Sequence, residues 1–281
     1  MKLIRYGQPG EERPGLIDAE GVWRDLSDHV TDLTGEALSP DALAHLGALE
    51  TSKLPLVPQG TRLGPPVSDP GKIVCIGLNY ADHAAETGRP APDEPMIFLK
   101  ATSALSGPND EIRIPRTSEK TDWEVELAVV IGTHAKYITD AQAMDHIAGF
   151  TVMNDVSERA FQNERGGQFT KGKSCDSFAP LGPWLVTKDD ITDPQNLRLW
   201  TEVDGTMRQD GTTADMVHPV AKTVAYLSQF MALHPGDIIA TGTPAGVGAG
   251  IRPDPVFLKP GQTVRIGIDG LGEQRCETVP D

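Results

Sequence analysis

Basic residues, cysteine and aromatic residues are all scarce in this sequence. Lys and Arg number 25 against 40 Asp and Glu, which gives a formal net charge of -15, and only 5% of the residues are aromatic. A nucleic-acid-binding protein needs a basic face that neutralises phosphates, so this charge balance argues against one. The three cysteines, Cys75, Cys175 and Cys276, lie far apart without a CxxC pair. We therefore expect reduced thiols, with neither a disulfide framework nor a zinc site.

Long apolar runs are also absent. No stretch approaches the roughly 18 apolar residues that a membrane helix needs, and the opening MKLIRYGQPGEERPG reaches glycine and charge too early for a signal peptide. We therefore predict a cytoplasmic protein without a membrane partner. Glycine and proline are plentiful, at 29 and 23 residues, and 38% of the chain is hydrophobic. This composition favours turns and short strands around a core, so we expect a β-rich α+β fold.

The sequence divides at about residue 70. Residues 1–70 predict a small N-terminal β domain, with a strand at 2–6, a hairpin within 16–26 and a closing linker rich in proline and glycine. Residues 71–281 predict a catalytic domain. We expect its helices at 79–86, with Asn79 as the N-cap, and at 141–146, 156–164 and 221–231. We expect its strands at 72–77, 96–100, 123–132, 149–155, 184–187, 197–205, 237–241 and 263–270.

The stretch TDWEVELAVVIG carries the strongest chemical pattern. On a strand, where side chains alternate between faces, Asp122, Glu124 and Glu126 share one face, and Trp123 and Val125 lie on the other. Carboxylates this close repel one another unless a cation neutralises them. Oxygen ligands select Mg²⁺, Mn²⁺ or Ca²⁺ rather than zinc. An amphipathic strand with its acidic face in water explains the same spacing, so a further acidic ligand is needed to decide.

Two other segments offer groups for such a site. Asp155 ends the strand expected at 149–155, where it serves either as a metal ligand or as the N-cap of the next helix. His83 and Glu86 are three residues apart, so on a helix they share a face and the carboxylate can orient the imidazole. A histidine held in this way suits a general base that activates water. A solvated ion pair is the simpler interpretation of the same spacing.

Two glycine-rich stretches resemble nucleotide-binding motifs but lack their context. Residues 167–174 read G-x-x-x-x-G-K-S, yet polar NERG precedes them and CDSFAPLGP follows, so the strand and helix of a P-loop are missing. Residues 242–250, GTPAGVGAG, precede IRPDPVF, which cannot form the helix of a dinucleotide-binding site. We interpret this second stretch as a tight turn whose backbone approaches a ligand closely.

From about residue 72 to its end, the sequence resembles the fumarylacetoacetate hydrolase superfamily. Six motifs occur in the family's order: GLNYADHAAE, EPMIFLK, DWEVELAVVIG, MNDVSERAFQ, KGKSCDSFAPLGPW and HPGDIIATGTPAGVG. The resemblance implies a mixed β-sandwich roll, a homodimer or dimer of dimers, and a small-molecule 2-oxo acid substrate. It also implies a bound Mg²⁺, or Mn²⁺ or Ca²⁺ in its place. The site residues that it implies are His83, Glu86 and Lys173 for catalysis, Arg159, Gln162 and Thr243 for substrate binding, and Glu124, Glu126 and Asp155 for the metal.

Both ends of the chain point to one branch of this family. MKLIRYG, PGLIDAEGVWRDLS and DGLGEQRC resemble hydrolases of 2,4-diketo-3-deoxy-L-rhamnonate or L-fuconate. This implies a hydrolase that cleaves a carbon-carbon bond of a 2,4-dioxo acid in sugar-acid breakdown, giving pyruvate and lactate. Acylpyruvase, oxaloacetate decarboxylase and hydroxymuconate-type isomerase activities use the same metal site and stay open.

One position departs from related sequences. Leu78 stands where some acylpyruvase-like members carry arginine, so a carboxylate contact is lost or moved. A protein of another class also stays open: a non-catalytic scaffold, in which a cation only stabilises the acidic strand.

Overall fold

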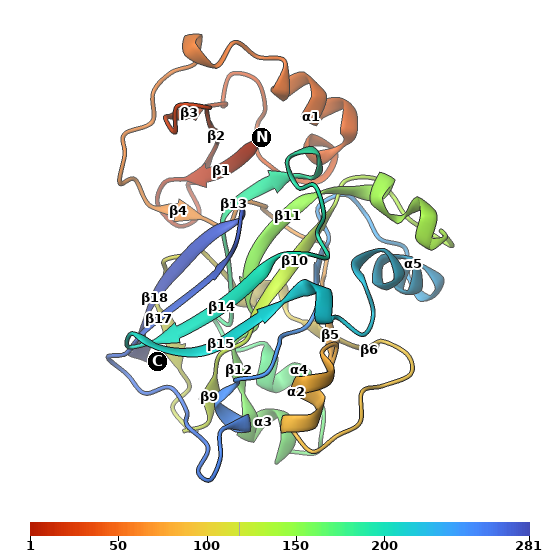
Figure 1. Cartoon of the computed structure of the whole chain (residues 1–281). Coiled ribbons are helices and arrows are strands. Elements are labelled where there is room, and N and C mark those ends of the chain that lie inside the picture. The colour runs from red at the N-terminus through yellow and green to blue at the C-terminus, as the bar shows by residue number, and fades with distance from the viewer. Residues whose placement is uncertain (118) are drawn as a thin grey trace.

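The computed structural model describes residues 1–117 and 119–281 and is built around a long mixed sheet (Figure 1). Along this sheet the strands follow the order β3-β2-β1-β13-β11-β10-β16-β5-β6, with β4 beside β1 and β7 beside β13. The strand bounds are β1 (Lys2–Tyr6), β2 (Arg13–Ile17), β3 (Trp23–Asp25), β4 (Leu63–Gly64), β5 (Ile73–Gly77), β6 (Met96–Lys100), β7 (Leu105–Ser106), β10 (Val125–Ile131), β11 (Ile147–Asn154), β13 (Ala179–Thr187) and β16 (Ile238–Ala240).

A second sheet, in the order β15-β14-β17-β18-β8, packs against β10, β11 and β13 of the first. A two-stranded sheet pairs β9 with β12. The bounds of these strands are β8 (Ile112–Ile114), β9 (Thr121–Asp122), β12 (Ser157–Glu158), β14 (Arg198–Val203), β15 (Thr206–Thr212), β17 (Thr263–Ile268) and β18 (Gly272–Pro280). The predicted β-rich α+β fold is therefore confirmed.

The helices are short and lie at the ends and flanks of the sheets. Figure 1 shows α2, α3 and α4 gathered at one end and α5 on a flank. The α-helices are α1 (Pro40–Gly47), α2 (Ala81–Glu86), α3 (Arg159–Asn163), α4 (Thr170–Lys173) and α5 (Val220–Phe230). Short 3₁₀ helices occupy Gly35–Leu38, Thr51–Lys53, Thr102–Ala104, Asp140–His146, Lys188–Asp190, Thr213–Asp215 and Gly248–Gly250. Within the described ranges, no helix has the length and apolar character to cross a membrane.

The pairing of β10 with β11 positions the acidic residues. Both strands are buried along their whole length, including Glu126 in β10 and Asn154 at the end of β11. They run antiparallel, with Val125 opposite Asn154 and Glu126 opposite Met153. The beginning of β10 therefore lies beside the end of β11. This register brings the acidic residues near the start of β10 next to Asp155, which follows β11 directly.

The N-terminal strands extend the main sheet. β1 pairs antiparallel with β13, with Lys2 opposite Val186. β2 and β3 form the predicted hairpin, since Ile17 pairs with Trp23. Apolar residues of both parts share one core: Leu3, Leu16, Leu26, Leu33, Leu38, Leu46, Leu54 and Val67 pack with Val130, Ala148 and Leu185. The domain division near residue 70 stays a prediction, but in space these residues share a sheet and a core with later strands.

Three local expectations need correction. α2 begins at Ala81, and its N-cap is Tyr80 rather than Asn79. The side chain of Asn79 instead bonds the main chains of His218 and Thr241, which ties the start of α2 to the strand end at β16. The helix expected at 156–164 is the short α3, because β12 occupies its first residues. The segment expected to be helical at 141–146 forms a 3₁₀ helix.

Candidate metal centre and active site

Three carboxylates gather where β10 begins and β11 ends. Glu124, Glu126 and Asp155 each offer an oxygen within 4.8 Å of the others. Their exposed fractions are 4%, 1% and 0%. The alternative of an amphipathic strand with its acidic face in water is therefore wrong. We call these three residues the acidic cluster. Its donors are all carboxylate oxygens, the ligand type that hard divalent cations prefer.

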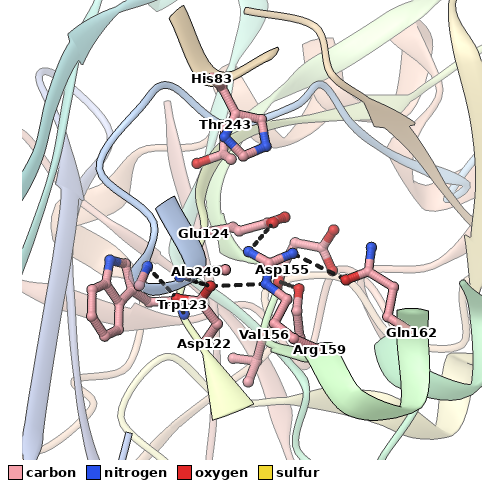
Figure 2. A network of polar contacts seen from close by, with 12 residues as sticks. His83, Asp122, Trp123, Glu124, Asp155, Val156, Arg159, Gln162, Thr243 and Ala249 are labelled. Carbon is pink, nitrogen blue, oxygen red and sulfur yellow. Dashed lines mark hydrogen bonds and ion pairs between the residues drawn. The ribbon is translucent and has the colours of Figure 1, made fainter. Parts of the chain in front are cut away.

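The third acid of the predicted strand face has a different partner. Asp122 is fully buried, and its Oδ2 accepts a hydrogen bond from Nε of Arg159 at 2.8 Å. Nη1 of Arg159 donates to Oε1 of Gln162 at 3.1 Å (Figure 2). Nη2 lies 2.7 Å from Oε1 of Glu124, an ion pair without the alignment of a hydrogen bond. Asp122 therefore fixes the arginine beside the acidic cluster, a role that strand alternation could not reveal.

Two buried lysines lie against the acidic cluster. Nζ of Lys173, in α4, lies 2.7 Å from Oε2 of Glu124 and 2.7 Å from Oδ2 of Asp155. Nζ of Lys100, at the end of β6, donates to Oδ1 of Asp155 at 2.5 Å and to the carbonyl of Val156. Sequence reasoning missed Lys100. The sequence does carry one indication, because Lys100 is the last residue of the apolar strand MIFLK. A lysine that is buried at such a place requires an anionic partner.

Burial and charge act in opposite directions on two of the carboxylates. Burial alone would raise the pKa of Glu124, but the charges of Lys173 and Arg159 outweigh it and hold that pKa well below its usual range. For Glu126, burial and then the negative charges of Asp155 and Glu124 raise the pKa well above its usual range. Glu126 is thus the member of the cluster whose charge is least compensated by the protein itself. A divalent cation would supply the missing compensation.

His83 and Glu86 form a hydrogen-bonded pair on α2. Nδ1 of His83 lies 2.7 Å from Oε1 of Glu86, as the three-residue spacing predicts. His83 is only 6% exposed, so the solvated ion pair considered from the sequence is wrong. Figure 2 shows its ring on the same side of the site as Thr243, above Glu124. With Nδ1 facing a carboxylate, Nε2 is the nitrogen that is left to act as a base.

The glycine-rich turn at 242–250 holds the acidic side chains in place. Its main-chain N–H groups point at carboxylates of the site. The donors are Gly242 to Glu126 at 2.8 Å, Gly246 to Glu86 at 2.9 Å and Gly248 to Asp122 at 2.7 Å. Gly242 has φ +97°, and a Cβ there would lie 2.7 Å from that of Asn79, so the turn needs glycine at this point.

Seven of the nine predicted site residues line one cavity. Its volume is about 220 Å³, a size suited to a small molecule. These seven are His83, Glu124, Glu126, Arg159, Gln162, Lys173 and Thr243. The other two, Glu86 and Asp155, contact lining residues directly. Thr243 has limited capacity for a ligand, because its hydroxyl donates to the carbonyl of Val125 and accepts from Gln209. Leu78, where the sequence departs from some related proteins, also lines the cavity.

The comparisons identify the family. Residues 72–279 match the model of the fumarylacetoacetate (FAA) hydrolase C-terminal domain. The chain therefore belongs to the fumarylacetoacetate hydrolase family. A protein of Burkholderia ambifaria strain MC40-6, named as an unconfirmed hydrolase, is 60% identical over 278 residues, which cover 99% of both chains.

Solved structures of this family share the fold over the whole chain. Maleylpyruvate hydrolase from Sphingobium sp. SYK-6, in complex with manganese(II) and pyruvate, is 30% identical with a TM-score of 0.82. The match covers 100% of this chain and 99% of that one. The 2-hydroxyhepta-2,4-diene-1,7-dioate isomerase from Mycobacterium marinum is 34% identical with a TM-score of 0.78 and the same coverage. The neighbours thus include both a hydrolase and an isomerase.

Proposed function

We propose that this protein is a metal-dependent hydrolase that cleaves a carbon-carbon bond of a 2,4-dioxo acid. The observation that carries the proposal is that His83, held by Glu86, lines the same small cavity as Glu124 and Glu126 of the acidic cluster. A metal-binding scaffold has no need of a buried histidine held by a carboxylate beside an accessible cavity. Such a histidine is the general base that hydrolysis requires.

The acidic cluster fits a hard divalent cation, since its donors are all oxygens and the pKa of Glu126 is raised by burial and by the negative charges of Asp155 and Glu124. We propose Mg²⁺ or Mn²⁺, with Ca²⁺ as a further candidate, and the manganese complex of the related maleylpyruvate hydrolase supports a metal of this kind. Glu124, Glu126 and Asp155 would hold it. The chemistry that such an ion supplies is Lewis-acid polarisation of a chelated 2-oxo acid.

The protein's own groups would perform the proton and charge steps. Nε2 of His83 takes a proton from water, while Glu86 holds the ring and stabilises the imidazolium that forms. The resulting hydroxide attacks the C4 carbonyl of the substrate. Collapse of the tetrahedral adduct breaks the C3–C4 bond, which releases one carboxylic acid and leaves the enolate of pyruvate. The imidazolium of His83 returns its proton to C3 of that enolate, which gives pyruvate and restores the base.

Lys173 and Arg159 face the charge that develops on the enolate. Two of the three N–H groups of Lys173 contact Glu124 and Asp155, which leaves one for a substrate oxygen. Arg159 is fixed by Asp122 and Gln162 before any ligand arrives. Donors that are held in advance stabilise a transition state without the cost of reorganisation.

A second candidate is isomerisation of an unsaturated 2-oxo acid, which the related isomerase favours. It needs a base that moves a proton between carbons, and His83 could serve there too. Oxaloacetate decarboxylation also stays open. The sugar-acid substrate implied by the chain ends, the dimeric state and the cytoplasmic location all stay predictions.

The test is a turnover assay with purified protein and Mn²⁺ or Mg²⁺. Candidate substrates are acylpyruvates, 2,4-diketo-3-deoxy sugar acids, oxaloacetate and an unsaturated 2-oxo acid. Pyruvate is measured for the first three, and the isomerised acid is measured for the last by its ultraviolet absorbance. We expect pyruvate from 2,4-dioxo acids and a loss of about 100-fold or more in His83→Gln. His29→Gln, at an exposed histidine, is the matched control. Pyruvate from oxaloacetate alone, or full activity in His83→Gln, would overturn the hydrolase proposal.

A further inference from the structure

Two exposed histidines lie opposite each other beyond the far end of the β10–β16 pair. β10 and β16 run antiparallel, and an isolated bridge between Ala135 and Leu233 continues their register past the strand ends. His134 and His234 form the next pair in that register, although they lie far apart in the sequence. The acidic cluster lies at the opposite end of β10, where that strand begins. These two histidines, which we call the histidine pair, are therefore separate from it.

The hydrogen bonds of the bridge bring the two histidine side chains close together. Ala135 and Leu233 each donate a main-chain N–H to the carbonyl of the other, both at 2.9 Å. Successive pairs of antiparallel strands alternate, so His134 and His234 form a non-hydrogen-bonded pair, in which side chains lie closest. The same alternation explains the burial, since Ala135 and Leu233 are fully buried and both histidines are exposed.

The backbone of His234 is fixed from two sides. Its main-chain N–H donates to Oδ2 of Asp237 at 2.7 Å, and Asp237 is itself buried and paired with Lys72. Pro235 follows His234, and a residue before proline is restricted mainly to extended conformations. A ligand that binds the histidine pair therefore has little backbone freedom to remove, which favours binding.

The two imidazole rings already have the separation of a metal chelate. Their centroids lie 5.1 Å apart, and their planes are inclined by 63°. Two imidazoles that bind one tetrahedral ion at about 2.0–2.1 Å have ring centres roughly 5 Å apart. Within the described parts of the chain, no hydrogen bond or ion pair occupies a ring nitrogen of either histidine. Both rings are therefore available to a ligand.

The donor type selects a different class of metal from that of the acidic cluster. Imidazole nitrogens suit Zn²⁺, Ni²⁺ and Cu²⁺, whereas carboxylate oxygens suit Mg²⁺ and Mn²⁺. Across residues 1–117 and 119–281, the acidic cluster is the one group of three or more carboxylate, histidine or cysteine ligands. The histidine pair thus offers two ligands, and its exposure lets water complete the coordination of an ion. The two sites differ in ligand chemistry as well as in position.

From this geometry we propose that His134 and His234 form a second metal site, which chelates one Zn²⁺, Ni²⁺ or Cu²⁺ ion at the surface. The ion joins the segment that follows β10 to the segment that precedes β16. It stabilises the folded chain, because the unfolded chain does not hold the two rings together. This proposal does not depend on the proposed hydrolase function or on a metal at the acidic cluster.

Calorimetric titration with Zn²⁺ tests the site. We expect His134→Gln and His234→Gln each to weaken one binding event about tenfold or more, because a chelate needs both ligands. The double variant should bind little more weakly than either single variant, since the first substitution already breaks the chelate. His45→Gln, at an exposed histidine of α1, is the matched control and should leave all events unchanged. Mn²⁺ titrations should be the same in all four variants.

A spectroscopic measurement separates the histidine pair from the acidic cluster. Cu²⁺ that is bound by two imidazoles shows splitting from two nitrogens in its electron paramagnetic resonance spectrum, which a carboxylate site lacks. Glu126→Gln disables the acidic cluster and should retain this nitrogen signal. The signal should disappear when His134→Gln is added to Glu126→Gln. The same pair of variants distinguishes failure of this proposal from failure of the proposed metal centre.

Three results would overturn the proposal. The first is an unchanged Zn²⁺ titration in the double variant. The second is independent, additive losses in the two single variants, which would show that each histidine binds its own ion. The third is oxygen-only coordination of Cu²⁺ in Glu126→Gln. Loss of Mn²⁺ binding in Glu126→Gln with the nitrogen signal intact would support both metal sites, whereas unchanged Mn²⁺ binding there would contradict the acidic cluster alone.

Discussion

Two ionic networks of similar make-up lie in different parts of this molecule. One joins the N-terminal strands to the loop before β8 and consists of Arg5, Glu12, Asp32, Arg62 and Asp110; we call it the N-terminal network. Its charges alternate in sign. Arg5 forms two hydrogen bonds with Asp32, at 2.7 and 3.0 Å, and Arg62 forms two with Asp110, at 2.8 and 2.6 Å. Glu12 lies between the two arginines.

The acidic cluster and the cations beside it also combine carboxylates with basic side chains, but in another order. Its three carboxylates meet directly, with oxygens within 4.8 Å of one another. Lys100, Lys173 and Arg159 approach two of them, whereas Glu126 has the N–H of Gly242 as its hydrogen-bond donor. In the N-terminal network every carboxylate faces a guanidinium. The comparison teaches that a dense ionic network alone does not mark a functional site, whereas the contact of buried like charges does.

Of the variants that test this comparison, we expect the largest effect from one that removes a carboxylate of the acidic cluster. Loss of a residue that only orients a metal ligand lowers metal affinity by roughly 10- to 100-fold. Glu126→Gln should lower Mn²⁺ affinity by more than this, because it removes a ligand and a charge together. Calorimetric titration with Mn²⁺ measures this. Glu12→Gln makes the same change in the N-terminal network and should leave the affinity unchanged. Equal affinity in both variants would show that the two networks do not differ in the way proposed.

Loss of a cluster lysine should have the next largest effect. In Lys100→Met, the buried Asp155 keeps Lys173 as its ionic partner but loses Lys100. We expect the free energy of unfolding of the metal-free variant to fall by about 3 kcal/mol. Saturating Mn²⁺ should then stabilise the variant more than it stabilises the wild type, because the ion replaces lost positive charge. Urea unfolding with and without Mn²⁺ measures both quantities. An equal or smaller metal-induced gain in the variant would contradict an ion at this cluster.

Sequence reasoning succeeded where the information is local. The spacing of Glu124 and Glu126 on a strand and of His83 and Glu86 on a helix depends on short periods, and the structure brings all four side chains to one site. The N-terminal hairpin was likewise visible in its turn residues. Family motifs supplied Asp155, which spacing alone left as either a ligand or a helix cap.

Sequence reasoning failed where the role of a residue depends on contacts with residues far away in the chain. Lys100 becomes a partner of Asp155 because β6 and β11 end at the same place in space. Asn79 has the residue type of an N-cap, but contacts 139 and 162 residues away take its side chain. The pairing of β1 with β13 also joins segments that no local pattern connects. Non-local pairing of this kind cannot be derived from the periodicity of one segment.

The smallest expected effect is in the N-terminal network itself. Arg62→Met removes the cationic partner of Asp110, which keeps the N–H of Gly107, and one partner of Glu12, at a side chain that is 23% exposed. Because water can partly solvate the carboxylates left behind, we expect a loss of about 1–2 kcal/mol of unfolding free energy. Arg13→Met, at a side chain 60% exposed, is the control and should cost less. Mn²⁺ should stabilise Arg62→Met and the wild type equally, since alternating charges leave no place for a cation. A larger gain from Mn²⁺ in Arg62→Met would mean that this network also binds metal, and the distinction between the two regions would fail.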